Sequence, residues 1–250
     1  MNAISLIRII FIALWSASIS LVAGFFLLIG GKKKGPELYQ SFSLIWSRII
    51  LEFCGIEVEV KGLEKLKNLQ GAILVSNHMS YFDTPIIVFV LKIAFRIVFK
   101  IELLKVAIFG WILGRSGNIP VDRKNPDEET YEKIEKALEQ GINVVMFAEG
   151  TSGYDNKISR FKRGPFIIAY EVGAVIIPVV IKGSYFIYNK TNKKLINSGK
   201  VTVEFLDPIK DFLDEEIFFR KSLPIKEKIR ATKKVKEKTR NTIVSKYWEA

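Results

Sequence analysis

The chain has 250 residues, 49% of them hydrophobic, and its 38 Lys and Arg outnumber its 26 Asp and Glu, for a formal net charge of +12. This length suits one domain with a substantial core, and the basic charge favours anionic partners, either nucleic acid or an acidic membrane surface. The single cysteine, Cys54, excludes an intramolecular disulfide framework and a cysteine-based metal site, and it is typical of a reducing, cytoplasm-facing compartment.

The first predicted element is an apolar helix at the N-terminus. Residues 9–29 carry no charged side chain over 21 positions, enough for about one bilayer crossing. Arg8 precedes this run and Lys32, Lys33 and Lys34 follow it, which predicts that the rest of the chain lies on the cytoplasmic side. A cleaved signal peptide is the alternative. It is disfavoured because the run is longer than a usual signal core and is followed by lysines instead of a small-residue cleavage site.

A second helix is predicted over residues 36–53, where apolar side chains recur every three to four positions. Two membrane arrangements follow: a spanning helix and then a surface helix, or a hairpin of two helices that enters one leaflet. Both arrangements would hold the rest of the chain against lipid headgroups. Alternatively, the second helix packs on the core of the domain. We assign residues 1–54 to membrane-anchoring helices.

From residue 55 onward, short runs rich in Val and Ile alternate with amphipathic stretches, which is typical of an α/β domain over residues 55–250. Several runs are continuously apolar, so we expect a mostly parallel sheet flanked by helices. The best-marked helix starts at Asn125, with Pro126 in its first position and Gly141 just beyond its end. Seven strands are predicted, at residues 56–60, 72–76, 97–100, 118–121, 143–147, 175–181 and 201–205.

The last predicted element is a basic helix. Residues 220–250 hold 11 Lys and Arg against three Glu, so they contribute +8 to the net charge. One weakly apolar face favours either adhesion to anionic lipid, at about 1 kcal/mol per basic residue near the surface, or a solvated terminal helix. The residues on that face are Ile225, Ile229, Thr232, Thr239 and Ile243.

Polar side chains follow the predicted strand 72–76, and they include the only histidine in the chain, His78. Open α/β sheets collect ligands at the carboxyl ends of their strands, so any histidine chemistry is expected here. Pro85 suits the first turn of a helix, which predicts a helix from about Thr84 with Asp83 as its cap. The turn between the strand and this helix would let the Asp83 carboxylate fold back on the imidazole.

A neutral imidazole held by a carboxylate can accept a proton near pH 7, because the carboxylate fixes the tautomer and stabilises the imidazolium. The chain has no G-x-S-x-G nucleophile motif, and Cys54 lies in the membrane-proximal segment, so a covalent intermediate has no obvious nucleophile. Direct attack by a substrate hydroxyl is then the simpler mechanism. Taken alone, however, the pair also fits a structural histidine and a helix cap.

Further motifs along the chain resemble, in the same order, those of the lysophosphatidic acid acyltransferase family, the 1-acyl-sn-glycerol-3-phosphate acyltransferases. Asn77, His78 and Asp83 match the first signature, Asn-His followed by four residues and Asp. Residues 100–103 (KIEL) are similar to the basic K-x-E-L stretch, and residues 117–123 (GNIPVDR) to the second signature. The remaining matches are residues 147–152 (FAEGTS), 161–164 (FKRG) and 177–181 (IPVVI).

The chain departs from the family pattern at three positions. Pro120 stands where an aromatic residue is usual, Ala148 replaces a proline and Ser152 replaces an arginine. The family arginine is expected to help hold a phosphate group. Arg160 or Lys162, in the same predicted loop as Ser152, could supply that charge.

The resemblance implies that His78 is the general base and that Asp83 orients it. It also implies that Arg123 and the turn formed by Glu149, Gly150 and Thr151 shape a glycerol phosphate site. Arginine suits phosphate through its bidentate fork, and a glycine lets the main chain approach an anion closely. Because a carboxylate would repel phosphate, we expect Glu149 to organise the turn and to bond to the substrate glycerol. Three further basic residues are candidates for this pocket, although each of them alone also fits a solvated surface charge. They are Lys100, Lys105 and Arg115.

The implied reaction transfers a fatty acyl group from an acyl thioester to the sn-2 hydroxyl of lysophosphatidic acid, giving phosphatidic acid in phospholipid biosynthesis. The expected partners are the membrane phospholipid bilayer at its cytoplasmic face, lysophosphatidic acid, and a thioester of acyl carrier protein or coenzyme A. No metal or other cofactor is expected. The alternatives are another lysophospholipid or glycerol 3-phosphate as acceptor, and a non-catalytic membrane-bound binder of anionic lipid. Nucleic acid is not an expected partner, because the basic tail lacks interleaved aromatic residues.

Overall fold

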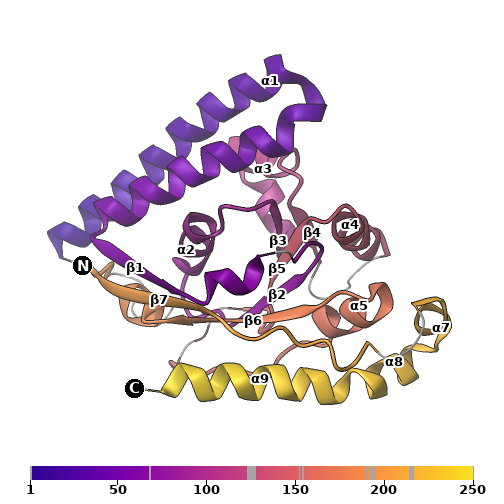
Figure 1. Cartoon of the computed structure of the whole chain (residues 1–250). Helices are drawn as coiled ribbons and strands as arrows, with labels where there is room; N and C mark the ends of the chain where they lie inside the picture. Colours follow the sequence, from indigo (N-terminus) through magenta and orange to yellow (C-terminus); the bar gives the residue numbers. More distant parts are fainter. Residues whose placement is uncertain are drawn as a thin grey trace.

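A computed structural model describes residues 2–67, 69–122, 128–151, 153, 155–189, 191, 195–213 and 217–249. The strands are β1 (Ile56–Lys61), β2 (Ile73–Ser76), β3 (Phe95–Lys100), β4 (Ile119–Val121), β5 (Asn143–Phe147), β6 (Ile176–Lys182) and β7 (Gly199–Phe205). They form one sheet in the order β1-β7-β6-β2-β5-β3-β4 (Figure 1). The strand pairs are parallel except for β6 and β7, which run antiparallel. The predicted strands and the mostly parallel α/β sheet are confirmed.

Both faces of the sheet are covered by helices, as Figure 1 shows. On one face lie α1 (Ala3–Phe53), α2 (Asp83–Val90) and α3 (Ala107–Leu113). On the other lie α4 (Glu128–Glu139), α5 (Gly164–Val172) and α9 (Lys233–Trp248). Neighbouring side chains of β6 alternate between the two resulting core clusters, because successive residues of a strand point to opposite faces. The central strands are therefore buried on both sides, as their apolar runs predict.

Short elements complete the connections around the sheet. They are η1 (Leu63–Leu66), η2 (Ile101–Lys105), α6 (Ser184–Ile187), α7 (Ile217–Ser222) and α8 (Ile225–Ala231). The helix that the sequence places from Asn125 is described from Glu128, as α4. Its predicted first turn, with Pro126, lies outside the described residues.

The N-terminal helix α1 folds back on itself. A straight helix of 51 residues would be about 76 Å long. Instead, the rings of Phe11 and Phe53 stack with centroids 3.6 Å apart, and Trp46 Nε1 donates to Ser16 Oγ at 2.9 Å. Figure 1 shows the two arms side by side. Of the two predicted membrane arrangements, the chain therefore has the shape of the helical hairpin.

The second arm of this hairpin is also part of the domain core, through the buried side chains of Ile50 and Leu51. The alternative in which this helix packs on the core is thus correct as well. The first arm is joined to the domain near its start, where Arg8 Nη1 donates to the carbonyl of Ile196 at 2.7 Å. The segment Ala3–Phe26 has a mean hydropathy of 2.2 and is long and apolar enough to cross a membrane.

The prediction of one basic helix over residues 220–250 is wrong, because this segment forms α7, α8 and α9. Pro224 separates α7 from α8, since a proline and the residue before it disfavour helix continuation. Ile225 was expected on the apolar face but is 58% exposed. The alternative of a solvated terminal helix does not hold for α9. This helix packs on the sheet through a buried face made of Val235, Thr239, Ile243 and Tyr247.

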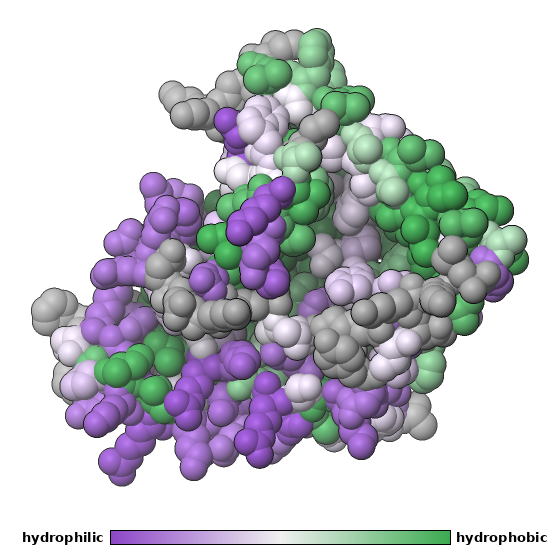
Figure 2. Space-filling model, turned by 180° about the vertical axis from the view of Figure 1, so that it is seen from behind, coloured by the Kyte–Doolittle hydropathy of each residue, from purple (hydrophilic) through white to green (hydrophobic). Residues whose placement is uncertain are grey.

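Part of the positive charge of this segment is paired inside the domain. Lys238 Nζ lies 2.5 Å from Asp211 Oδ2, and Lys246 Nζ lies 3.2 Å from Glu204 Oε1. Figure 2 shows hydrophilic residues along the lower part of the molecule, where α9 lies, and hydrophobic residues gathered over the α1 hairpin. The molecule thus presents an apolar hairpin at one end and a basic helix at the other.

Candidate active site

The motif of His78 and the motif at residues 147–152 meet because their strands are neighbours. Ser76 at the end of β2 pairs with Phe147 at the end of β5 in the parallel register. The carboxyl ends of parallel strands lie at the same edge of a sheet, so the turns that follow them adjoin. The His78 ring stacks on Phe147, with centroids 4.4 Å apart and an interplanar angle of 24°. The sequence signal for this stacking was only that both motifs follow apolar strands.

The carboxylate of Asp83 folds back on the imidazole of His78, as the turn between strand and helix predicts. Asp83 Oδ2 lies 2.8 Å from His78 Nδ1, and the aspartate side chain is fully buried. Because a carboxylate accepts hydrogen bonds, we assign the proton of the neutral ring to Nδ1, which leaves the lone pair on Nε2. His78 lines a cavity. The imidazole is therefore held in place by a carboxylate at the wall of a cavity.

The expected capping role of Asp83 is wrong. Helix α2 begins at Asp83, and within the described part of the chain no side chain caps its first turn. The carboxylate bonds backward instead: Oδ2 accepts from the main-chain N–H of Met79 at 2.7 Å and of Ser80 at 2.8 Å. These bonds fix the turn that carries His78, and the N-terminus of α2 favours the negative charge.

Asn77 locks the end of β2 to β6, a role that the sequence did not reveal. Its side-chain Nδ2 donates to the carbonyl of Ile181 at 3.0 Å, and its Oδ1 accepts from the N–H of Ile181 at 2.9 Å. Asn77 and Ile181 are both buried, where water does not reach them. The side chain of Asn77 therefore supplies the hydrogen bonds that the N–H and the carbonyl of Ile181 need. The available signal was an amide side chain directly after a fully apolar strand.

Glu149, in the turn after β5, binds the main chain of the histidine turn. Its side chain is buried, with Oε1 accepting from the N–H of His78 at 2.8 Å and Oε2 from the N–H of Ser159 at 2.7 Å. Burial raises the pKa of Glu149, and these two N–H donors lower it in part. In the same region, the N–H of Gly153 donates to the carbonyl of His78 at 2.8 Å. Glu149 therefore organises this turn, while its expected bond to glycerol stays a prediction.

The rest of this turn lies at the edge of the cavity. Gly150 has a φ of +75°, a left-handed conformation that favours glycine. Thr151 is exposed and lines the cavity together with His78. The exposed side chain of Lys162 passes beside Gly150, and its main-chain N–H donates to the carbonyl of Ala148 at 2.7 Å. Arg160 lies exposed in the same loop.

The other basic candidates are spread more widely. Lys100 lines the cavity with His78 and pairs with Glu102 at 3.0 Å. Lys105, exposed at the end of η2, and Arg115, whose guanidinium lies 4.1 Å above the Trp111 ring, are not among the cavity-lining residues. Arg123 and Ser152 lie outside the described residues.

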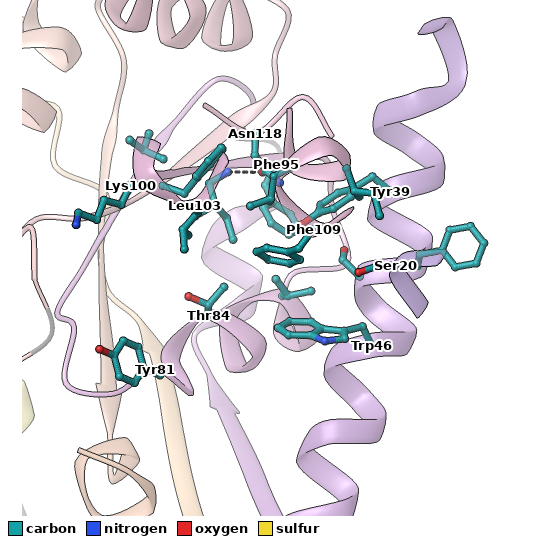
Figure 3. Close-up of a pocket in the computed structure, with 18 of the residues that line it drawn as sticks. Ser20, Tyr39, Trp46, Tyr81, Thr84, Phe95, Lys100, Leu103, Phe109 and Asn118 are labelled. Carbon is teal, nitrogen blue, oxygen red and sulfur yellow. Dashed lines mark hydrogen bonds between the residues drawn. The ribbon is translucent and has the colours of Figure 1, made fainter. Parts of the chain in front are cut away.

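The cavity itself is mostly apolar and has a volume of about 410 Å³. It lies between the two arms of α1 on one side and α2, β3, η2 and α3 on the other. In Figure 3, Tyr39 and Trp46 of α1 point toward Phe95 and Phe109 across this space. From the sequence, residues 1–54 were expected to anchor the chain, with packing on the core as the alternative for residues 36–53, and a role as a cavity wall was not predicted. Apolar periodicity does not distinguish a lipid-facing residue from a cavity-lining one.

Comparison with known proteins adds a family to this geometry. Residues 57–182, half of the chain, match the family model described as acyltransferase. A 1-acyl-sn-glycerol-3-phosphate acyltransferase of Haemophilus influenzae is 30% identical over 167 residues, which cover 66% of this chain and 68% of that protein. The chloroplastic 1-acyl-sn-glycerol-3-phosphate acyltransferase LPAT1 of Arabidopsis thaliana is 27% identical over 176 residues, which cover 69% of this chain and 49% of that protein. The chain thus spans about half the length of the plant relatives it matches.

The fold is also known from a crystal structure. The 1-acyl-sn-glycerophosphate (LPA) acyltransferase PlsC of Thermotoga maritima superposes with a TM-score of 0.73 at 21% identity, over 99% of this chain and 96% of that one. At this identity, the likeness establishes the α/β fold. The family match, by contrast, rests on the sequence, and it includes His78, Asp83 and Glu149. From this match and the Haemophilus influenzae relative, the chain belongs to the acyltransferase family.

Proposed function

We propose that the protein transfers an acyl group from a thioester to the sn-2 hydroxyl of 1-acyl-sn-glycerol 3-phosphate, giving phosphatidic acid. The observation that carries this proposal is the 2.8 Å contact between Asp83 Oδ2 and His78 Nδ1 beside a largely apolar cavity. The acceptor follows from the relatives, whose names specify 1-acyl-sn-glycerol-3-phosphate. The whole chain's activity is inferred on these grounds together.

In the proposed reaction, His78 Nε2 removes the proton of the acceptor hydroxyl while its oxygen attacks the thioester carbonyl carbon. A carbon–oxygen bond forms, and the tetrahedral intermediate then expels the thiolate by breaking the carbon–sulfur bond. The imidazolium returns the proton to the departing sulfur. Asp83 stabilises the imidazolium during the cycle and keeps Nε2 directed at the substrate. No covalent intermediate on the protein is needed.

The apolar cavity is the proposed site for an acyl chain. Its lining is mainly aliphatic and aromatic, including Ile19 and Phe42 from the two arms of α1. Burial of an aliphatic chain there is favourable at about 25 cal/mol for each Å² of apolar surface. His78 and Thr151 line the same cavity, so a chain bound there can present its ester or thioester end to the imidazole.

For the acceptor phosphate, the proposed site is the edge formed by Gly150 and the cations around it. Lys162 passes beside Gly150, Arg160 lies in the same loop, and Lys100 lines the cavity with His78. Charge-assisted bonds from such cations suit a phosphate. By resemblance, Arg123 also belongs to this set. Its guanidinium could bind the phosphate through two parallel hydrogen bonds, which the single ammonium of a lysine cannot reproduce.

The α1 hairpin is proposed to enter one leaflet of the membrane at its cytoplasmic face. Its first arm exposes Leu14 by 65%, Leu21 by 57% and Phe25 by 59%, which favours contact with lipid. The arm is tied to the second arm by Trp46 and to the domain by Arg8, which argues against crossing the bilayer. Both arms line the cavity, so a lipid substrate can reach His78 without leaving the membrane surface.

An acyl-transfer assay with the purified full chain in vesicles tests this proposal. The donors are acyl carrier protein and coenzyme A thioesters, and the acceptors are lysophosphatidic acid, lysophosphatidylglycerol and glycerol 3-phosphate. We expect phosphatidic acid from lysophosphatidic acid with the highest kcat/KM, without added metal or cofactor. A higher kcat/KM for another acceptor would change the assignment of the substrate. Vesicle binding without any transfer would instead support a non-catalytic lipid binder.

A further inference from the structure

The basic C-terminal helix α9 contacts the loop that holds the active site, and the proposed reaction does not yet account for this. We call residues 148–163 the β5–α5 loop, of which 152 and 154 are not described. On its inner side, this loop binds both main-chain groups of His78, through Glu149 and Gly153. On its outer side, it faces α9 on the sheet face opposite the α1 hairpin (Figure 1).

One residue, Ser159, connects α9 to Glu149. The N–H of Ser159 donates to Glu149 Oε2 at 2.7 Å, while its carbonyl accepts from Arg240 Nε at 2.9 Å. Arg240 Nη2 also donates to the carbonyl of Ile158 at 2.7 Å. Arg240 therefore grips two successive carbonyls with its fork, a geometry that the single ammonium of lysine cannot reproduce.

A second contact holds the same loop. Tyr247 Oη donates to Asn156 Oδ1 at 2.5 Å, and Asn156 has a φ of 52°, a left-handed conformation that few residues other than glycine adopt. Burial raises the pKa of Tyr247 to about 12, with a contribution from the negative charges of Asp83 and Glu149. The phenol therefore stays a proton donor near pH 7.

The helix that provides these contacts is firmly attached. Its face made of Val235, Thr239, Ile243 and Tyr247 is buried on the sheet. The residue after the gripped carbonyl of Ser159 is Arg160, and Lys162 follows two positions later. A rigid support thus ends directly beside the cations proposed for the acceptor phosphate.

We infer that Arg240 and Tyr247 are positioning residues that hold the β5–α5 loop so that its cations meet the acceptor phosphate. The inference rests on the proposed function for the identity of the acceptor. Neither residue touches the reacting atoms, and each acts through the loop. The specificity for a phosphate-bearing acceptor would then depend on a helix on the far side of the sheet.

The first test measures the loop without any substrate. Hydrogen exchange is followed by mass spectrometry in wild-type protein, Arg240→Ala, Arg240→Lys and Tyr247→Phe. We expect faster exchange in peptides covering residues 148–163 in Arg240→Ala, a smaller change in the other two variants, and unchanged exchange in the central strands. Lys238→Ala is the matched control, because Lys238 lies on α9 and pairs with Asp211 instead of the loop. Unchanged exchange of the loop in Arg240→Ala would overturn the inference.

The second test separates positioning from a general structural effect. In Arg240→Ala, the KM for lysophosphatidic acid should rise about tenfold while the KM for the acyl thioester stays within about twofold, since only the charge-assisted phosphate contacts are displaced. Arg240→Lys should recover part of this affinity, and Lys238→Ala should match the wild type. A fall in kcat with both KM values unchanged would show a merely structural role and overturn the inference.

The two tests also distinguish this inference from the proposed function. If wild-type protein transfers no acyl group to lysophosphatidic acid while the loop loosens in Arg240→Ala, the proposed function fails and the support by α9 stands. If the wild type is active but the loop and the KM for the acceptor are unaffected in Arg240→Ala, the inference fails and the proposed function stands. Arg240→Lys and Tyr247→Phe keep the inference testable should Arg240→Ala lower the melting temperature.

Discussion

The two turns at the carboxyl end of the sheet hold their shape in different ways. The turn after β2 is closed by its own residues, because Asp83 bonds His78, Met79 and Ser80 within five positions. The β5–α5 loop is held from outside, by His78, Arg240 and Tyr247, which lie 71 to 91 positions away in the sequence. The first turn carries the base, and the second carries the groups proposed to bind the acceptor.

This difference suggests that the turn with the base is rigid and that the binding loop is adaptable. A general base needs a fixed tautomer and direction, which short-range bonds to one carboxylate provide. A binding loop that depends on distant supports can be changed by substitutions far from the substrate. We therefore expect substitutions in the turn after β2 to act on kcat. Substitutions of the residues that support the β5–α5 loop from α9 should act mainly on the KM for the acceptor.

Asp83→Asn tests the first turn and should have the largest effect among substitutions that keep the imidazole. The amide oxygen can take the place of Oδ2 and its three hydrogen bonds, but the neutral amide cannot stabilise an imidazolium. We expect kcat to fall by about 10² to 10⁴-fold, as measured by acyl transfer at saturating substrates. A variant with the wild-type circular dichroism spectrum and a kcat within tenfold of wild type would break the comparison.

Glu149→Gln tests the link between the two turns. A glutamine has one acceptor oxygen for the two partly buried N–H donors of His78 and Ser159, so one donor is left facing an amide NH₂ group. We expect the unfolding free energy to fall by about 1–3 kcal/mol and kcat/KM by about 10- to 100-fold. Urea unfolding and steady-state kinetics measure the two. Glu129→Gln, at an exposed pair with Lys133, should change neither.

Asn77→Ala removes the attachment of the end of β2, where the first turn begins, to β6. Its loss leaves the N–H and carbonyl of Ile181 unpaired at the end of β6. We expect a loss of about 1–3 kcal/mol in unfolding free energy and a smaller effect on kcat, about tenfold, because the bonds to Asp83 remain. A larger kcat effect than that of Asp83→Asn, in folded protein, would mean that the first turn is not held locally.

The smallest effect on either turn is expected from the exposed face of the α1 hairpin. Leu14→Glu combined with Leu21→Glu should weaken binding to vesicles at least about tenfold, because two apolar side chains would leave the lipid. In detergent-dispersed assays, kcat should stay within about twofold of wild type. Vesicle sedimentation measures the first quantity, and unchanged sedimentation would contradict leaflet insertion by this face.

The locally held turn is also the part of the site that the sequence could predict. The contact between His78 and Asp83 follows from a strand, a turn and a helix start within a few residues, and the strands follow from their apolar runs. The capping role expected for Asp83 was wrong because its carboxylate bonds to N–H groups before the helix instead of within it.

Features that depend on distant partners could not be predicted. Nothing near Arg240 in the sequence indicates that two carbonyls 81 and 82 positions away will accept from its guanidinium. The apolar pattern of α1 also fits a spanning helix, a hairpin and a core helix equally well, since all three have the same period. From the thin apolar stripe of the C-terminal segment, its division into α7, α8 and α9 could not be predicted. The burial of Thr239 of α9 on the sheet could not be predicted either.

The most direct test of the central claim is acyl transfer to lysophosphatidic acid by His78→Ala beside wild-type protein. The main-chain bonds of His78 to Glu149 and Gly153 do not involve its side chain, so the variant should keep the fold and bind the acceptor. We predict that the formation of phosphatidic acid in single-turnover assays slows by at least about 10³-fold. A folded His78→Ala protein that forms phosphatidic acid within tenfold of the wild-type rate would contradict the account.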